Sequence, residues 1–308
     1  MKDISIDEYS SFVKQKRNSW FMSPYELVYK AFSDMGYASK DKEFFIDNAS
    51  EIVETLREKC WNTYVPIEKS FTSAMLRELI DEDIVNDMTP QEAITWFVEK
   101  YPDHIYSLTL SNTQSRRSRA GKEFEAIIEL ILIGAGIPMD SQGNIGKQVF
   151  VQKGLGKLVD VVSPGVVEFA IDKNDTVLIS AKTTLRERWQ EVPEEMGRTG
   201  AREMYLATLD TSISDEVLNT LYEANIRITT TKNIKDKFYP DNRRVLTFEQ
   251  LVAIAKDYYS RWLNFEYDLN LRDQIIGNIN IQIEKHSNHS FVADYYKKRL
   301  SLFGEAGE

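Results

Sequence analysis

The first third of the chain repeats apolar residues with the spacing of amphipathic helices. In residues 24–36 the apolar positions recur every three or four residues, at Tyr25, Val28, Ala31, Phe32 and Met35. Thr89 followed by Pro90 is typical of a helix N-cap and first helical residue, and Pro102 marks the end of that helix. We therefore expect residues 1–110 to form a helical N-terminal subdomain.

The pattern changes after residue 110. Residues 111–122 are polar and basic, and they lead into an apolar helix pattern closed by Gly134 and Gly136. Short apolar runs bounded by turn residues then indicate strands, at 148–152, 157–162, 166–171, 176–181, 204–209 and 226–231. The order of helices and strands predicts an α/β fold with a mixed central β-sheet flanked by helices. We expect it to occupy residues 111–308, together with the C-terminal helices.

The amino-acid composition limits which partners and which metal sites the chain can have. The 308 residues include 38 basic and 48 acidic side chains, and the net charge of -10 argues mildly against a nucleic-acid partner unless basic residues gather locally. The single cysteine, Cys60, excludes an internal disulfide and Cys-rich zinc modules, and only three histidines are present. A catalytic metal should therefore sit on carboxylates, which favours Mg2+. The chain lacks a signal-peptide pattern and an apolar span of ~20 residues, so we expect a cytoplasmic protein with no membrane partner.

Two carboxylates and a lysine stand where the predicted elements could bring them together. Asp160 lies within one predicted strand, Lys182 ends another, and Glu195 lies on the helical stretch that follows. Acids that hold a metal and a lysine that orients or activates water are the minimum set for metal-assisted phosphodiester hydrolysis. Taken singly, each residue also fits a structural interpretation, as a turn or edge carboxylate, a solvated strand end or an exposed helix acid.

The segments around these residues resemble a known family. The stretch SAKTTLRERWQEVPEE (180–195), with KLVDVVSPG (157–165) and SRRSRAGKEFE (115–125), is similar to the type II restriction endonucleases of the SsoII, PspGI and EcoRII group. The resemblance covers roughly residues 111–250. It implies a variant of the PD-(D/E)xK nuclease fold, and it is closest to the SsoII-like members, which recognise CCNGG.

The resemblance assigns roles to individual residues. The usual motif carries an acid two residues before the lysine, where this chain has Ser180. In the variant the second acid comes from the downstream helix, which matches Glu195. Asp160, Lys182 and Glu195 are thus implied as catalytic, with Asp160 and Glu195 as the Mg2+ ligands. Glu125 is implied as an accessory acid.

The triplet Arg186, Glu187 and Arg188 is implied to read the DNA sequence, and its chemistry supports that role. Each arginine can donate a pair of hydrogen bonds to a guanine in the major groove, and a glutamate can accept from cytosine amines. Two adjacent G·C pairs would satisfy the triplet. A two-fold homodimer would apply it to both halves of a palindrome such as CCNGG. The alternative is a solvated helix start of mixed charge.

Two further groups of residues are expected at the DNA. The basic stretch 111–122 should lie along the backbone, with Gln114 reading minor-groove edges and cations neutralising phosphates, namely Arg116, Arg117, Arg119 and Lys122. A plain basic loop is the alternative. Arg57 and Trp61 lie four residues apart on a predicted helix and could form a pocket for a flipped base, as members of the family flip the central base pair. The alternative is that Trp61 is a core aromatic.

The leading hypothesis is a homodimeric, Mg2+-dependent type II restriction endonuclease that cuts double-stranded DNA at a CCNGG-like site. A cognate DNA methyltransferase would protect the host's own sites. Two alternatives remain open from the sequence. One is another PD-(D/E)xK nuclease, for repair or junction cleavage, and the other is a non-catalytic, sequence-specific DNA-binding regulator.

Overall fold

The computed structural model describes residues 4–157 and 159–304, and the chain forms two compact units. The helical unit comprises Met1–Leu27 and Glu58–Lys122, and the sheet unit comprises Val28–Arg57 and Glu123–Glu308. This division differs from the predicted boundary between residues 110 and 111. The long helices α4 (Ala49–Arg77) and α7 (Pro102–Gly134) each contribute to both units, so a single boundary along the chain cannot separate them.

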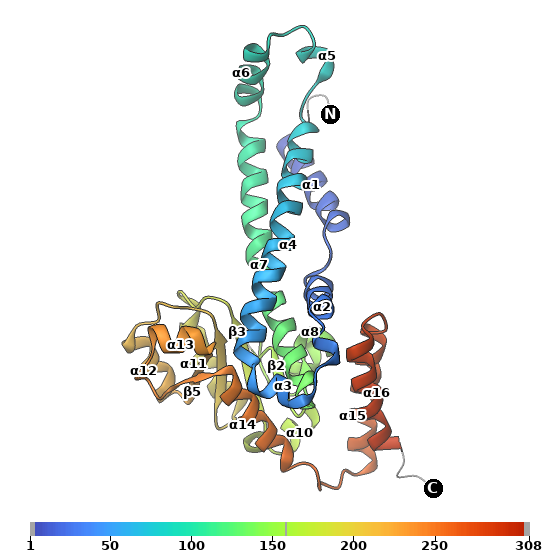
Figure 1. Cartoon of the computed structure of the whole chain (residues 1–308), viewed down its shortest axis with the longest axis vertical. Coiled ribbons are helices and arrows are strands. Elements are labelled where there is room, and N and C mark those ends of the chain that lie inside the picture. Colours follow the sequence, from blue (N-terminus) through green and yellow to red (C-terminus); the bar gives the residue numbers. More distant parts are fainter. Residues whose placement is uncertain (1–3, 158, 305–308) are drawn as a thin grey trace. The chain divides into compact units, whose positions relative to one another are not determined.

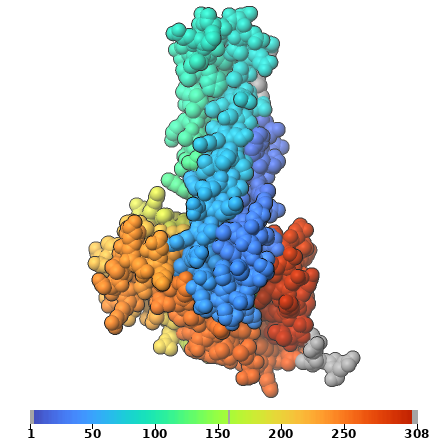
Figure 2. Space-filling model, in the orientation of Figure 1, coloured from blue at the N-terminus to red at the C-terminus, as the bar shows by residue number. Residues whose placement is uncertain are grey.

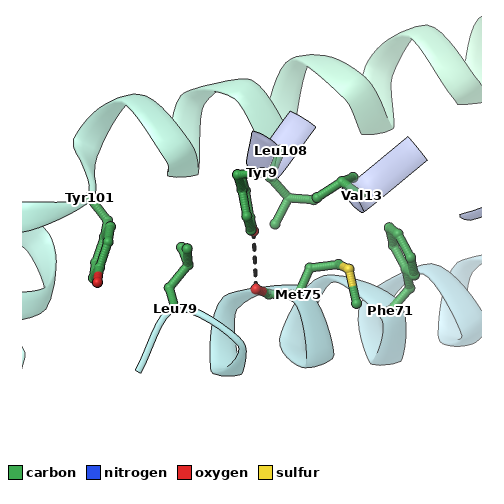
Figure 3. Close-up of a cluster of buried hydrophobic side chains, with 7 residues drawn as sticks. All are labelled: Tyr9, Val13, Phe71, Met75, Leu79, Tyr101 and Leu108. Carbon is green, nitrogen blue, oxygen red and sulfur yellow. Dashed lines mark hydrogen bonds between the residues drawn. The ribbon is translucent and has the colours of Figure 1, made fainter. Parts of the chain in front are cut away.

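The helical unit is built on α1 (Ile6–Trp20), which runs beside segments of α4 and α7 (Figures 1 and 2). Buried side chains of these helices and of the segments next to them meet in one apolar cluster (Figure 3), formed by Tyr9, Val13, Phe71, Met75, Leu79, Tyr101 and Leu108. Tyr9 donates its hydroxyl proton to the carbonyl oxygen of Met75 at 3.0 Å, so its polar tip is satisfied inside the cluster. The unit also contains α5 (Glu82–Val85) and α6 (Pro90–Lys100).

Helix boundaries in this unit follow the predicted signals. Thr89 and Glu92 form a capping box at the start of α6, with Pro90 as the first helical residue, and α6 ends before Pro102. The basic stretch 111–122, for which a loop was the alternative, is helical throughout because it continues α7. Its Arg, Gln, Ser and Lys side chains are compatible with a helix interior, and Gly121 is tolerated there.

In the part of the chain that the structure describes, six strands form one mixed sheet in the order β1-β2-β3-β4-β5-β6. The first three are antiparallel neighbours and the last four are parallel neighbours. Their bounds are β1 Asp140–Ser141, β2 Val161–Ser163, β3 Val177–Lys182, β4 Met204–Thr208, β5 Ile226–Thr230 and β6 Val245–Thr247. Strands β3 and β4 are almost wholly buried, as their continuous apolar runs predict. The predicted mixed sheet is confirmed.

Helices surround the sheet, as Figure 1 shows. They are α3 Lys42–Asp47, α8 Gln142–Ile145, α9 Lys147–Gln152, α10 Val166–Ile171, α11 Glu191–Thr199, α12 Asp215–Glu223, α13 Lys232–Phe238, α14 Phe248–Ser260, α15 Leu269–Lys285 and α16 Ser290–Gly304, with short 3-10 turns at Tyr37–Ser39, Lys173–Asp175 and Arg188–Gln190. Helix α2 (Pro24–Asp34) contributes residues to both units. Two predicted strands, 148–152 and 166–171, are therefore wrong, since they form α9 and α10. Short apolar runs do not distinguish a buried strand from a buried helical turn.

No helix within residues 4–157 and 159–304 is both long enough and apolar enough to cross a membrane.

Candidate active site

Asp160 and Lys182 meet at the ends of two neighbouring strands. Asp160 directly precedes β2, and its amide donates to the carbonyl oxygen of Ile179 on β3 at 2.9 Å. Lys182 is the last residue of β3, and its Nζ lies 2.9 Å from Oδ2 of Asp160. The expected pairing of the carboxylate and the ammonium group is therefore confirmed. The antiparallel pairing of β2 with β3 brings the two side chains together, because the start of β2 lies beside the end of β3.

The Asp160 carboxylate is held firmly and is largely removed from water. Its Oδ2 also accepts a hydrogen bond from the Ala181 amide at 2.7 Å, and the side chains of Asp160 and Lys182 are only 11% and 14% exposed. Burial raises the pKa of Asp160, against the opposing effects of the Lys182 ammonium group and the Ala181 amide. Anything that adds positive charge at this carboxylate, such as a divalent cation, would favour its ionised form.

Glu195 projects from α11 against the segment that leads into Asp160. Its Oε2 accepts from the Lys157 amide at 3.2 Å, and its Oε1 lies 3.4 Å from Nη1 of Arg198. Gly156 makes room for it, because a Cβ there would collide with Oε2 of Glu195. Gly156 also has a φ of +72°, a conformation that favours glycine.

The chemistry of these side chains fits a hard cation. Among residues 4–157 and 159–304, no group of three or more His, Cys, Asp or Glu side chains is arranged to hold a metal. Asp160 and Glu195 supply carboxylate oxygens, the ligands that Mg2+ takes from proteins. Glu125, predicted as an accessory acid, is half-buried on the part of α7 that belongs to the sheet unit.

The triplet that is predicted to read the DNA sequence begins after only three residues beyond Lys182. Arg186, Glu187 and Arg188 are all exposed, in a turn between β3 and α11. The backbone beneath them is anchored by Leu185, whose side chain is only 2% exposed and whose amide donates to Oδ2 of Asp210 at 2.9 Å. Asp210 is not among the residues predicted for the site. Its signal was an acid just after the C-terminal end of a buried strand, the edge where sites of open α/β sheets lie.

The residues of the helical unit that are predicted to contact the DNA backbone fall into two groups. Arg116 pairs with the buried Glu68, its Nε donating to Oε2 at 2.7 Å. Arg119 donates to the Met22 carbonyl oxygen at 2.8 Å. The second group projects from α7 as exposed side chains and comprises Gln114, Arg117 and Lys122. Arg116 and Arg119 therefore already make hydrogen bonds within this unit, although the Arg116 side chain is still 48% exposed. Gln114, Arg117 and Lys122 present their polar groups to solvent.

The two residues predicted to hold a flipped base both lie on α4. In the sheet unit, Nη1 of Arg57 lies 3.5 Å from Oε2 of the buried Glu123. In the helical unit, Trp61 is 51% exposed, so it is not a core aromatic. The Arg116 guanidinium group lies 5.9 Å from the centre of the Trp61 ring, within the range of a cation–π contact.

Relatives of known activity share this architecture. The family described as EcoRII C terminal matches residues 77–252. The type II restriction enzyme SsoII of Shigella sonnei is 52% identical over 301 residues, which cover 98% of this chain and 99% of that protein.

Solved structures agree with that relationship. Metal-depleted Ecl18kI, in complex with uncleaved DNA and with uncleaved, modified DNA, matches with a TM-score of 0.92 and 51% identity, over 97% of this chain and 100% and 99% of those chains. A complex of the restriction endonuclease PspGI with substrate DNA matches with a TM-score of 0.57 and 18% identity, over 78% of this chain and 94% of that chain, which shows the fold alone. These relationships exclude a non-catalytic regulator. The chain belongs to the EcoRII C-terminal family, and it is a type II restriction endonuclease.

Proposed function

We propose that this enzyme uses Mg2+ to cleave both strands of DNA at a CCNGG-like palindrome. The proposal rests on two sets of residues that lie close together at the end of β3. Lys182 pairs with Asp160, and the exposed triplet Arg186, Glu187 and Arg188 begins after three intervening residues. The triplet suits two adjacent G·C pairs, and a homodimer would present it to both half-sites. In the cytoplasm, a cognate methyltransferase would protect the host's sites.

The residues of the active site divide the work of hydrolysis. Asp160 and Glu195 would hold the metal through their carboxylates. When bound, Mg2+ supplies the positive charge that stabilises the phosphorane-like transition state. The Lys182 Nζ lies 2.9 Å from Asp160. From this position the lysine can orient the attacking water toward the phosphorus atom, and it can stabilise the negative charge that develops on the phosphate oxygens in the transition state. Glu125 would assist as an accessory acid.

A plasmid digestion tests the proposed reaction. With Mg2+, a plasmid of known sequence should give a ladder of fragments that maps to CCNGG sites, and EDTA should abolish cleavage. Ca2+ should support specific binding without turnover, because it is larger and takes looser coordination than Mg2+. A smear of random fragments, or a ladder that maps to another sequence, would refute the proposed site.

We further propose that the central base pair of the site is flipped onto Trp61. The triplet covers only two pairs per subunit, so a five-pair site leaves one pair between the halves. Flipping costs a few kcal/mol, and stacking on an exposed aromatic can return ~1–3 kcal/mol per base. Trp61 is exposed, as this role requires.

A fluorescent base at the centre of the site tests the flipping role. Binding should change the fluorescence of 2-aminopurine placed there, and Trp61→Ala should alter that signal in a folded protein. Tyr106→Ala is a matched control, because Tyr106 is a 69% exposed aromatic of the same unit. An unchanged signal on binding would contradict flipping, and equal signals from wild type and Trp61→Ala would contradict the role of Trp61.

A further inference from the structure

The turn that carries the recognition triplet adopts a backbone conformation that L residues rarely take. Arg186 has a φ of 45° although it is not glycine, and left-handed residues of this kind persist only where the surrounding structure holds them. The residues on either side have little flexibility, since Leu185 is buried and the Arg188 amide donates to the Leu185 carbonyl oxygen at 2.9 Å. A contact from outside the turn must therefore stabilise the unusual backbone.

That contact comes from the end of the neighbouring strand β4. Lys182 of β3 pairs in parallel register with Thr208 of β4, and the Leu209 amide donates to the Thr183 carbonyl oxygen at 3.3 Å. The next residue, Asp210, is thereby placed beside the turn. Its Oδ2 accepts from the Leu185 amide at 2.9 Å, and the neighbouring Arg186 amide helps to lower the pKa of this carboxylate.

Asp210 is itself fixed by its own surroundings. Its Oδ1 accepts from the amide and the hydroxyl of Ser212 at 3.0 and 2.9 Å. Its carbonyl oxygen accepts from the Tyr239 hydroxyl at 3.0 Å. Although burial alone would raise the pKa of Asp210, the amides of Leu185, Ser212 and Arg186 together with the Ser212 hydroxyl lower it. The carboxylate therefore stays ionised and presents both oxygens as acceptors.

We propose that Asp210 is a positioning residue for sequence recognition, which holds the backbone at Leu185 and Arg186 so that the arginines of the triplet point at the DNA bases. This inference rests on the proposed function, namely that the triplet reads G·C pairs. The simpler alternative is that Asp210 only closes its own turn at Ser212, as Asp172 does by accepting from the Asn174 amide at 2.8 Å. Asp210 differs because its second oxygen reaches across to another strand end.

Binding to two duplexes distinguishes these roles. One duplex carries a CCNGG site, and in the other every G·C pair of the site is replaced by A·T; both are titrated without divalent metal. Asp210→Ala should weaken binding to the first duplex by about ten- to a hundredfold, the range of one lost base contact. Affinity for the second duplex should change by less than about twofold, because backbone contacts remain. Asp172→Ala, the matched control, should behave as wild type.

Two further variants test whether Asp210 acts through Arg186. Asp210→Asn keeps one acceptor oxygen and should give an intermediate loss, and it carries the same test if Asp210→Ala does not fold. The double variant Asp210→Ala, Arg186→Ala should bind no more weakly than Arg186→Ala alone. Fully additive losses, or equal losses for both duplexes, would overturn the role of Asp210.

The single variant Arg186→Ala distinguishes failure of the proposed base reading by the triplet from failure of the positioning role of Asp210. If it discriminates between the duplexes as wild type does, base reading by this arginine is wrong and the inference fails with it. If Arg186→Ala loses discrimination while Asp210→Ala and Asp210→Asn keep it, the triplet reads the bases without help from Asp210, and only the inference is overturned.

Discussion

The end of β3 carries two regions that are fixed in opposite ways. At the proposed active site the side chains are held, since Asp160 and Lys182 are 11% and 14% exposed and paired with each other. Glu195 of α11, the third residue of the proposed set, is 13% exposed and accepts from the Lys157 amide. At the recognition turn the backbone is held, through Leu185 and Asp210, while the side chains of the triplet extend into solvent. Only three residues separate Lys182 from Arg186.

This difference agrees with the task that the proposed function gives each region. Hydrolysis requires charged groups that are already in position before the transition state forms, since moving them during the reaction would raise the barrier. Base reading instead requires side chains that exchange water for base edges, which buried groups cannot do. A fixed backbone limits the entropy that those side chains lose on binding. Changes in the first region should therefore affect cleavage, and changes in the second should affect discrimination.

The largest effect is expected at the active-site carboxylate. Asp160→Ala removes a proposed metal ligand and the partner of Lys182, so cleavage should fall by several orders of magnitude. Single-turnover digestion of a CCNGG duplex with Mg2+ measures this. Cleavage at a near-normal rate would remove Asp160 from the active site.

A smaller loss is expected from crowding Glu195. Gly156→Ala introduces a Cβ that collides with the Glu195 carboxylate, and a displacement of about 1 Å at a catalytic group can lower the rate about a hundredfold. Gly154→Ala is a matched control, because Gly154 also has a positive φ, +78°, but has no atom within 4 Å of the added Cβ. Both variants should lose ~1 kcal/mol of folding free energy. Equal cleavage rates for the two would contradict the role of Glu195.

Substitutions in the triplet should alter discrimination. Arg186→Ala or Arg188→Ala should cost ~1–3 kcal/mol of preference at one G·C pair, measured by binding to duplexes that differ at that pair. A uniform loss of affinity for every duplex would mean that the arginine contacts only phosphates.

The smallest effect is expected in the helical unit. Arg117→Ala removes an exposed cation of α7, and if it contacts one phosphate the slope of log affinity against log salt should fall by about 0.9 without loss of stability. Arg116→Ala should instead destabilise the fold by about 1–3 kcal/mol, because it removes the cation that pairs with the buried Glu68. Denaturant unfolding and salt titration of both variants test this contrast. Equal stabilities for the two variants would contradict the structural role of Arg116.

The sequence predicts those parts of the fold that depend on local pattern. The apolar runs of β3, β4 and β5 stand out because those strands are buried on both faces, and the resemblance to a family assigned Asp160, Lys182 and Glu195. The helices α9 and α10 were missed because their apolar runs are short. The Arg116–Glu68 pair and the contact of Asp210 with the turn depend on which helices and strands become neighbours. Neither contact could be predicted, because each joins residues that are far apart in the sequence.

The most direct test of whether cleavage and sequence reading are separate functions is the preference of Asp160→Ala for its DNA site. Its affinity is measured without divalent metal for a CCNGG duplex and for one in which every G·C pair of the site is replaced. Loss of a negative charge near the DNA can strengthen binding to both duplexes, but the ratio of the two affinities should equal that of wild type, whereas Arg186→Ala should reduce it by at least about fivefold. A reduced ratio for Asp160→Ala would contradict the account, because it would place sequence reading and cleavage in one inseparable site.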